Sequence, residues 1–247
     1  MTANLEIEGL RKDFGGVVAV DGFDMALDRG ELHALVGPNG CGKSTLFNLI
    51  TGAFPPTGGR VRFDGRDITG APPWRISRLG IGRKFQVPAV FGDLSVLQNL
   101  MVPHWAHERL PMWSPAARYG RGDRTGELMA RIGLADKADM PADRLAHGER
   151  QWLEIGMLLA SDARLMLLDE PTAGMTPAET TATAALIRDI ASAGDATILV
   201  IEHDIGFIRE LDCPVTVMAK GRVLLSGAYG AIRADAAVRE LYFGRWG

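Results

Sequence analysis

The sequence predicts an α/β fold with a mainly parallel sheet, and its pattern of apolar runs is the first observation behind this prediction. Short apolar runs of the kind that form buried strands recur in the second half of the chain: residues 165–168, 197–201 and 215–218. Helical patterns near 177–193 and 204–211 alternate with them. Such alternation is typical of parallel strands joined by crossover helices.

The second observation is a strand, a glycine-rich loop and a helix near the N-terminus. Three apolar-rich segments separated by Gly and Asp turn signals predict strands: residues 5–10, 17–27 and 31–36. After Lys43 the apolar spacing becomes helical, and Gly52 suits the end of that helix. Two further strands are predicted at 60–64 and 80–85.

The third observation is a long helical stretch in the middle of the chain. Between residues 94 and 160 strand signals are absent and helical patterns dominate, apart from a Pro-, Arg- and Gly-rich interruption from Pro103 to Arg124. We therefore expect a helical subdomain inserted into the α/β body. The chain is predicted to be one domain over residues 1–247, with its core at 1–93 and 161–247 and the insertion at 94–160.

The composition limits the classes of function. A chain of 247 residues with 47% hydrophobic content can bury a core, and it lacks the roughly 18 consecutive apolar residues of a membrane-spanning helix. No signal-peptide pattern opens the sequence, so we expect a cytoplasmic protein. Cys41 and Cys213 form neither a disulfide framework nor a zinc motif. The formal charge of −3 argues against broad nucleic-acid binding.

The glycine-rich loop after the third strand fits the phosphate-binding pattern G-x-x-x-x-G-K-[ST]. Glycine-rich turns are usually only turns, but a position between a strand and a helix favours phosphate binding, because backbone N–H groups and the helix N-terminus attract anions. Lys43 is expected to reach the β- and γ-phosphates and Ser44 to bind Mg²⁺. The candidate nucleotide-binding residues are Gly37, Pro38, Asn39, Gly40, Cys41, Gly42, Lys43, Ser44 and Thr45.

Two adjacent carboxylates follow the apolar run at 165–168. Asp169 is expected to hold Mg²⁺ through water, and Glu170 to polarise the water that attacks the γ-phosphate. An Asp-Glu pair after a strand is most often a solvated loop, so this hypothesis depends on Lys43. His203 follows the run at 197–201 and can reach the same phosphate only if its strand neighbours those of Lys43 and Asp169.

These motifs, in this order, resemble the ATP-binding-cassette (ABC) family over nearly the whole chain. The resemblance implies a P-loop NTPase fold with an N-terminal antiparallel β subdomain and the inserted helical subdomain, and ATP and Mg²⁺ as cofactors. It implies that Phe14 stacks on adenine, that Gln86 contacts Mg²⁺ and acts in catalysis, and that His203 is the switch histidine. The segment 173–176 matches the loop after the catalytic glutamate Glu170.

The resemblance also implies that residues 145–149 form the signature motif, which caps the nucleotide of a partner cassette through Ala146, His147, Gly148 and Glu149. This motif departs from the family pattern, because Ala146 replaces a usual Ser and Glu149 a usual Gln. Thr176 likewise replaces a usual Asp, and His147 a Gly. We hypothesise that the missing hydroxyl and the added negative charge weaken the capped site.

Within the family, residues 82–99, 152–157 and 238–245 are most similar to ATPase subunits of branched-chain amino acid importers, nearest the urea and short-chain amide branch. The implied partners are two membrane permease subunits, a second ABC ATPase subunit in a heterodimer or homodimer, and indirectly a periplasmic binding protein, with no nucleic acid. The implied location is the cytoplasmic face of the bacterial inner membrane. The segment 87–91 is expected to dock on a permease.

Three alternatives stay open at this stage. A lipopolysaccharide-type export ATPase resembles the same branch, and a soluble ATPase of iron–sulfur assembly shares the cassette motifs. A lone nucleotide kinase or GTPase accounts for Lys43 but leaves Gln86, residues 145–149 and His203 without a role.

Cys41 lies inside the phosphate loop, and the preferred interpretation is that it is an incidental small residue. The alternative is a thiol whose pKa is lowered by the loop N–H groups and the helix N-terminus. Alkylation of Cys41 is expected to block ATP binding.

Overall fold

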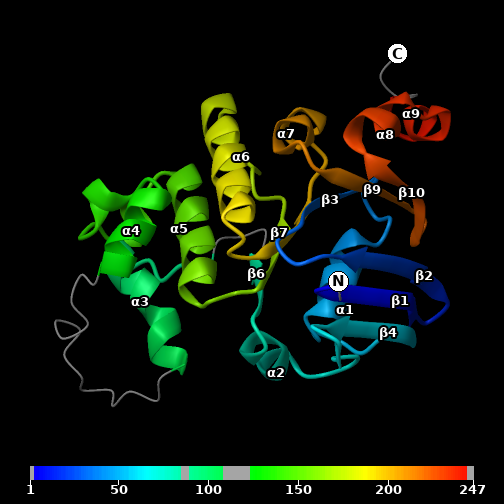
Figure 1. Cartoon of the computed structure of the whole chain (residues 1–247), viewed down its shortest axis with the longest axis horizontal. Coiled ribbons are helices and arrows are strands. Elements are labelled where there is room, and N and C mark those ends of the chain that lie inside the picture. The colour runs from blue at the N-terminus through cyan, green and yellow to red at the C-terminus, as the bar shows by residue number, and fades with distance from the viewer. Residues whose placement is uncertain (1–2, 85–88, 108–122, 244–247) are drawn as a thin grey trace.

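The computed structural model describes residues 3–84, 89–107 and 123–243. Its centre is a six-stranded sheet in the order β10-β9-β3-β8-β7-β6 (Figure 1). The strands are β3 (Leu32–Val36), β6 (Ile81–Lys84), β7 (Leu165–Asp169), β8 (Thr197–Ile201), β9 (Pro214–Ala219) and β10 (Arg222–Ala228). Every neighbouring pair is parallel except β9 and β10. The predicted mainly parallel sheet is confirmed. The apolar run at 215–218 indicated β9, but no run indicated its antiparallel neighbour β10 at the edge.

A second sheet of four strands contains the N-terminus of the described chain. Its strands are β1 (Leu5–Phe14), β2 (Val17–Leu27), β4 (Gly58–Phe63) and β5 (Arg66–Asp67), in the order β2-β1-β4-β5. All of its pairs are antiparallel. This sheet is the antiparallel β subdomain that the family resemblance implied.

Helices cover both faces of the six-stranded sheet and one of its edges. They are α1 (Lys43–Ile50), α2 (Pro73–Arg78), α3 (Val96–His107), α4 (Asp123–Arg131), α5 (His147–Ala160), α6 (Pro177–Ser192), α7 (Ile205–Leu211), α8 (Tyr229–Ala234) and α9 (Ala236–Phe243), with 3₁₀ turns at Ala135–Lys137 and Ala142–Arg144. In Figure 1, α3, α4 and α5 gather at the β6 edge, whereas α8 and α9 lie at the opposite end. The helices of the predicted insertion therefore form one group.

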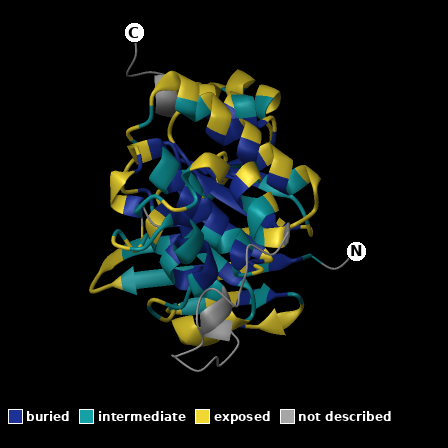
Figure 2. Cartoon of the chain, turned by 90° about the vertical axis from the view of Figure 1, so that its left-hand side faces the viewer, coloured by how far each residue is buried: buried dark blue, intermediate teal, exposed yellow. Residues whose placement is uncertain are grey.

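Two hydrophobic clusters lie on opposite faces of the central sheet. Leu167 and Leu199 point toward α1 and the four-stranded sheet, and Leu168 and Val200 point toward α3 to α9. Successive residues of a strand point to opposite faces, and both faces of this sheet are covered. The strands β7 and β8 are therefore buried along their whole length. Figure 2 shows the buried residues at the centre and the exposed ones at the periphery.

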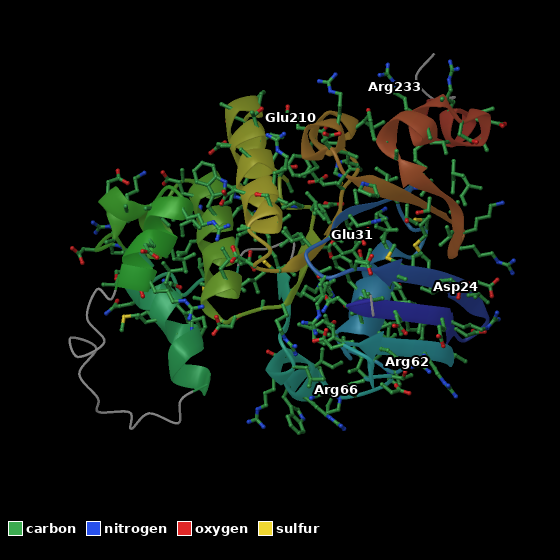
Figure 3. The ribbon with its side chains drawn as sticks, viewed as in Figure 1. Asp24, Glu31, Arg62, Arg66, Glu210 and Arg233 are labelled. Atoms are coloured by element: carbon green, nitrogen blue, oxygen red, sulfur yellow. The ribbon has the colours of Figure 1, made fainter. Side chains whose placement is uncertain are left out.

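The surface carries charges of both signs. Figure 3 shows Asp24, Arg62 and Arg66 on the four-stranded sheet, and Glu210 and Arg233 on α7 and α8. Within the described residues, no helix combines the length and the apolar composition needed to cross a membrane.

Candidate nucleotide site

The loop between β3 and α1 has a backbone that requires glycine at two positions. A Cβ on Gly37 would lie 2.3 Å from the carbonyl oxygen of Met218, and one on Gly42 would lie 2.2 Å from that of Ala19. Gly42 also has a φ of 111°, in the region that side chains avoid. These glycines let the chain turn tightly from the sheet into α1.

The side chain of Lys43 folds across this loop. Its Nζ donates hydrogen bonds to the carbonyl oxygens of Gly37, at 2.6 Å, and Pro38, at 3.1 Å. The residue is only 7% exposed. A buried ammonium held by two neutral carbonyls gains a stronger partner when a phosphate arrives, because hydrogen bonds between ions exceed those to neutral groups.

The loop opens into a pocket of about 920 Å³, including its solvent-open part, that unites residues distant in sequence. Its lining consists of Ala19, Asn39, Gly40, Gly42, Lys43, Ser44, Thr45, Glu170, Ile201 and His203. The parallel strands β3, β7 and β8 are neighbours, so the residues that follow their carboxyl ends meet at one edge of the sheet. The structure thereby meets the condition on which the His203 hypothesis depended.

Glu170 and His203 face each other in this pocket. Oε1 of Glu170 lies 3.5 Å from Nδ1 of His203. Glu170 has a φ of 46°, uncommon for a residue with a side chain, and its N–H donates to the carbonyl of Ile201 at 2.9 Å. This backbone geometry turns the chain away from β7 directly after Asp169, so that the two adjacent carboxylates take separate directions.

Glu202 connects the loops that follow β7 and β8, and sequence reasoning did not find it. Its Oε1 accepts hydrogen bonds from the N–H of Thr172 at 3.2 Å and from its hydroxyl at 2.6 Å. Its Oε2 accepts one from the N–H of His203 at 3.0 Å. Glu202 is 1% exposed, so these bonds compensate for the loss of water around the carboxylate. The only signal was an acidic residue next to the histidine.

The oxygen ligands near the pocket fit a Mg²⁺ ion that takes most of its coordination from phosphate and water. Among the described residues, no cluster of three or more His, Cys, Asp or Glu side chains is arranged to hold a metal. Ser44 at the pocket and Asp169 at the end of β7 supply a hydroxyl and a carboxylate. Mg²⁺ prefers such oxygen ligands and usually takes the rest of its coordination from water and substrate phosphates.

The lining of this pocket leaves out the predicted site residues Phe14, Gly37, Pro38, Cys41 and Asp169. The Phe14 ring packs edge-on against Phe54 at a centroid distance of 5.3 Å, with the Lys12 ammonium 5.0 Å from its centre. Phe14 remains 44% exposed and is not among the pocket-lining residues. Gln86 lies outside the described residues.

The signature segment lies at the start of α5 and does not line the phosphate-loop pocket of its own chain. Ala146 is the N-cap residue of this helix. Nε2 of His147 lies 2.9 Å from the carbonyl oxygen of Ala173, in the loop after Glu170. A Cβ on Gly148 would approach Oε1 of Glu179 to 2.5 Å. The signature segment therefore packs against the 173–176 loop of the same chain.

A lowered pKa for the thiol of Cys41 is wrong. Cys41 is 5% exposed, and burial raises the pKa of its thiol, outweighing the opposite effect of the nearby Lys43 ammonium. A Cβ on Gly37 would lie 2.6 Å from its sulfur, which shows how tightly the thiol is packed. Desolvation of the thiolate is the stronger effect because the sulfur faces the core instead of the phosphate side of the loop.

The loop, its lysine and the two consecutive carboxylates at the end of β7 define a P-loop nucleoside triphosphatase. A family model described as ABC transporter matches residues 20–173. The chain belongs to the ABC transporter family, and its activity is the binding and hydrolysis of ATP, with Mg²⁺, coupled to transport.

Individual relatives agree with this assignment. The high-affinity branched-chain amino acid transport ATP-binding proteins BraF of Pseudomonas aeruginosa and LivG of Escherichia coli are each 34% identical to this chain over 97% of both sequences. The ribose import ATP-binding protein RbsA 1 of Burkholderia thailandensis is 35% identical over 99% of this chain, which spans 47% of that protein. An ATP-binding cassette of an ABC transporter, solved in its ADP conformation, has a TM-score of 0.84 at 29% identity, covering 99% of this chain and 100% of that one.

Proposed function

We propose that the pocket at residues 37–45 is the ATP site and that Lys43, Ser44, Asp169, Glu170 and His203 carry the hydrolysis. The observation that carries this proposal is the single pocket shared by the phosphate loop, Glu170 and His203. Lys43 binds the β- and γ-phosphates, Ser44 binds Mg²⁺, and Asp169 holds the ion through water. The ion neutralises charge on the phosphates. Gln86 joins the metal ligands and the catalytic residues in this proposal.

Glu170 acts in this scheme as the group that polarises the attacking water. A carboxylate accepts a hydrogen bond from the water and orients its lone pair toward phosphorus, and His203, 3.5 Å away, orients the carboxylate and contacts the γ-phosphate. The test is ATP binding and turnover of the purified chain after Glu170→Gln. Retained MgATP binding with most turnover lost supports the assignment, and near-normal turnover removes Glu170 from this role.

The cargo in this proposal is a branched-chain amino acid, urea or a short-chain amide, moved inward through two permease subunits. The names of BraF and LivG support the amino acid, and that of RbsA 1 supports import. Lipopolysaccharide export and iron–sulfur assembly have no such support among these relatives. Uptake of labelled leucine, urea and acetamide into cells, with Lys43→Ala in the chromosomal copy, distinguishes the cargoes. Loss of none of the three uptakes argues against the import assignment.

The working assembly in this proposal is a cassette dimer at the cytoplasmic face of the inner membrane, fed by a periplasmic binding protein. Part of the predicted permease-docking segment is described: Phe91 is 50% exposed, whereas Val90 packs against the core. Val87 and Pro88 lie outside the described residues. An exposed aromatic ring on a loop suits a partner surface. Cysteine crosslinks from Ala89 to a cytoplasmic permease loop test this placement, and their absence in an active transporter contradicts it.

A further inference from the structure

Arg83 and Lys84, the last two residues of β6, point to opposite faces of the central sheet. Arg83 is in register with Leu167 and Lys84 with Leu168, and these two leucines belong to the opposite hydrophobic clusters. Arg83 therefore lies on the α1 face, and Lys84 lies on the α5 face, where its Nζ is 3.9 Å from Oε2 of Glu154. The sheet register thus brings the Arg83 guanidinium to the phosphate-loop helix.

The Arg83 guanidinium bridges two elements of the nucleotide site. Nη2 donates to Oδ2 of Asp169 at 2.7 Å, and Nη1 donates to Oδ1 of Asn48 at 2.6 Å. The guanidinium carbon lies 5.5 Å from the ring centre of Phe47. The side chains of Arg83 and Asp169 are each 9% exposed. A planar guanidinium with fixed donors and a ring under it has little freedom, so it fixes the two oxygens it binds.

Asn48 places one end of the Arg83 bridge on the helix that carries Ser44. Asn48 is four residues after Ser44 in the same helix, so the two side chains lie on one face, one turn apart. Ser44 lines the pocket, and Asp169 is the last residue of β7. Arg83 consequently connects the carboxylate of Asp169 to the same helix face that carries the Ser44 hydroxyl.

We propose that Arg83 is a positioning residue for the magnesium site: it holds Asp169 through Oδ2 and sets the separation between this carboxylate and the Ser44 hydroxyl. The inference rests on the proposed metal roles of Ser44 and Asp169. In this proposal Arg83 acts through Asp169 and binds neither the metal nor the nucleotide directly. Its contribution is geometric, because a carboxylate fixed by a second-sphere donor does not need to be reoriented when the ion binds.

A different role for Arg83 is simple charge compensation of a buried carboxylate. Any cation at this position serves that purpose, and it competes with Mg²⁺ instead of assisting it, since both are attracted to Asp169. The two roles predict different results for Arg83→Lys. Lysine keeps the charge but cannot present two parallel donors to Asn48 and Asp169, so Arg83→Lys separates geometry from charge.

The experiment measures the affinity of the purified chain for a non-hydrolysable ATP analogue by calorimetry, once with Mg²⁺ and once with EDTA. The ratio of the two affinities reports the metal contribution, and the metal-free affinity reports an intact phosphate loop. The variants are Arg83→Lys, Arg83→Met, Asn48→Ala and Asp169→Asn. Arg164→Lys is the matched control, because Arg164 also forms an ion pair with an aspartate, Asp64, remote from the pocket.

The expected result is a metal-dependence ratio reduced at least fivefold in Arg83→Lys, with metal-free affinity within twofold of wild type. Asn48→Ala shows a smaller reduction, and Arg164→Lys shows none. An unchanged or increased ratio in Arg83→Lys overturns the inference while leaving the site assignment intact. An unchanged ratio in Asp169→Asn overturns the metal assignment itself and the inference with it. If Arg83→Met fails to fold, Arg83→Lys and Asn48→Ala still decide the outcome.

Discussion

The carboxylate of Glu149 accepts a hydrogen bond from the backbone N–H of Ala146 at 3.0 Å and closes the first turn of α5. The same carboxylate is paired with the ammonium of Lys137. In the sequence, Glu149 stood out as an added negative charge facing a polyphosphate. The structure shows that this charge is already engaged within the chain, so its repulsion of a partner's nucleotide is reduced.

The first prediction separates the two signature departures. Ala146→Ser should raise steady-state ATPase activity several-fold, because a hydroxyl can hydrogen-bond a γ-phosphate where a methyl group cannot. Glu149→Gln should change the rate by less than twofold, because Lys137 already offsets the charge. Activities of both single variants and the double variant, at equal ATP occupancy, measure this. A large gain from Glu149→Gln alone shows that the charge still acts on the capped site.

The same hydrogen bond makes a stability prediction for Glu149→Ala. Losing the carboxylate leaves the Ala146 N–H without its side-chain partner and removes a negative charge from the positive end of α5. The free energy of unfolding should fall by about 1 kcal/mol. Urea denaturation measures this free energy. The control is Glu127→Ala, which removes a carboxylate from α4 and leaves the first turn of α5 unchanged. An equal loss in both variants contradicts the capping role.

Lys84 and Glu154 form a buried pair between β6 and α5, and their exposed side-chain fractions are 0% and 6%. Burial lowers the pKa of Lys84, and the carboxylate of Glu154 is the strongest influence raising it back. Lys84→Met should cost about 3–5 kcal/mol of folding free energy, because it removes the cation beside the buried carboxylate of Glu154.

Adding Glu154→Gln to Lys84→Met should recover part of this loss, because the buried charge is then removed as well. Glu154 also accepts the N–H of Ala89 at 3.3 Å, and glutamine retains an oxygen that can accept this bond. A double-mutant cycle from urea denaturation measures the coupling. Additive losses in the two single variants mean that the pair does not act as a unit.

Cys41 should react slowly with maleimides at neutral pH. Its buried thiol has a pKa above the usual cysteine value, so the reactive thiolate is a small fraction at pH 7. As pH rises toward that pKa, the thiolate fraction and the labelling rate should rise about tenfold per pH unit. Mass spectrometry of pulse-labelled protein, with free cysteine as the reference, measures both. A rate at pH 7 equal to that of free cysteine contradicts the burial argument.

The sequence by itself determined the local structures of the nucleotide site. The phosphate loop needs glycine at positions 37 and 42 because backbone atoms approach too closely for a Cβ. Both glycines are part of the motif, so the sequence alone predicts this requirement. The apolar runs that became β7 and β8 were equally readable, because both faces of these strands are buried. Sequence order also indicated that Asp169, Glu170 and His203 follow strands, which places each of them at a strand end.

Only the tertiary structure decided which of these ends meet and which charges pair. The neighbour order of β3, β7 and β8 brings Glu170 and His203 to Lys43. Sheet register sends Arg83 to Asn48 and Asp169, and packing of a 3₁₀ turn against α5 places Lys137 beside Glu149. Side-chain contacts of this kind depend on distances between segments far apart in sequence, and local patterns of hydrophobicity and turn residues carry no information about those distances. The tertiary structure also decided the pKa of the Cys41 thiol, because the packing of the sulfur, and not its place in the motif, sets this value.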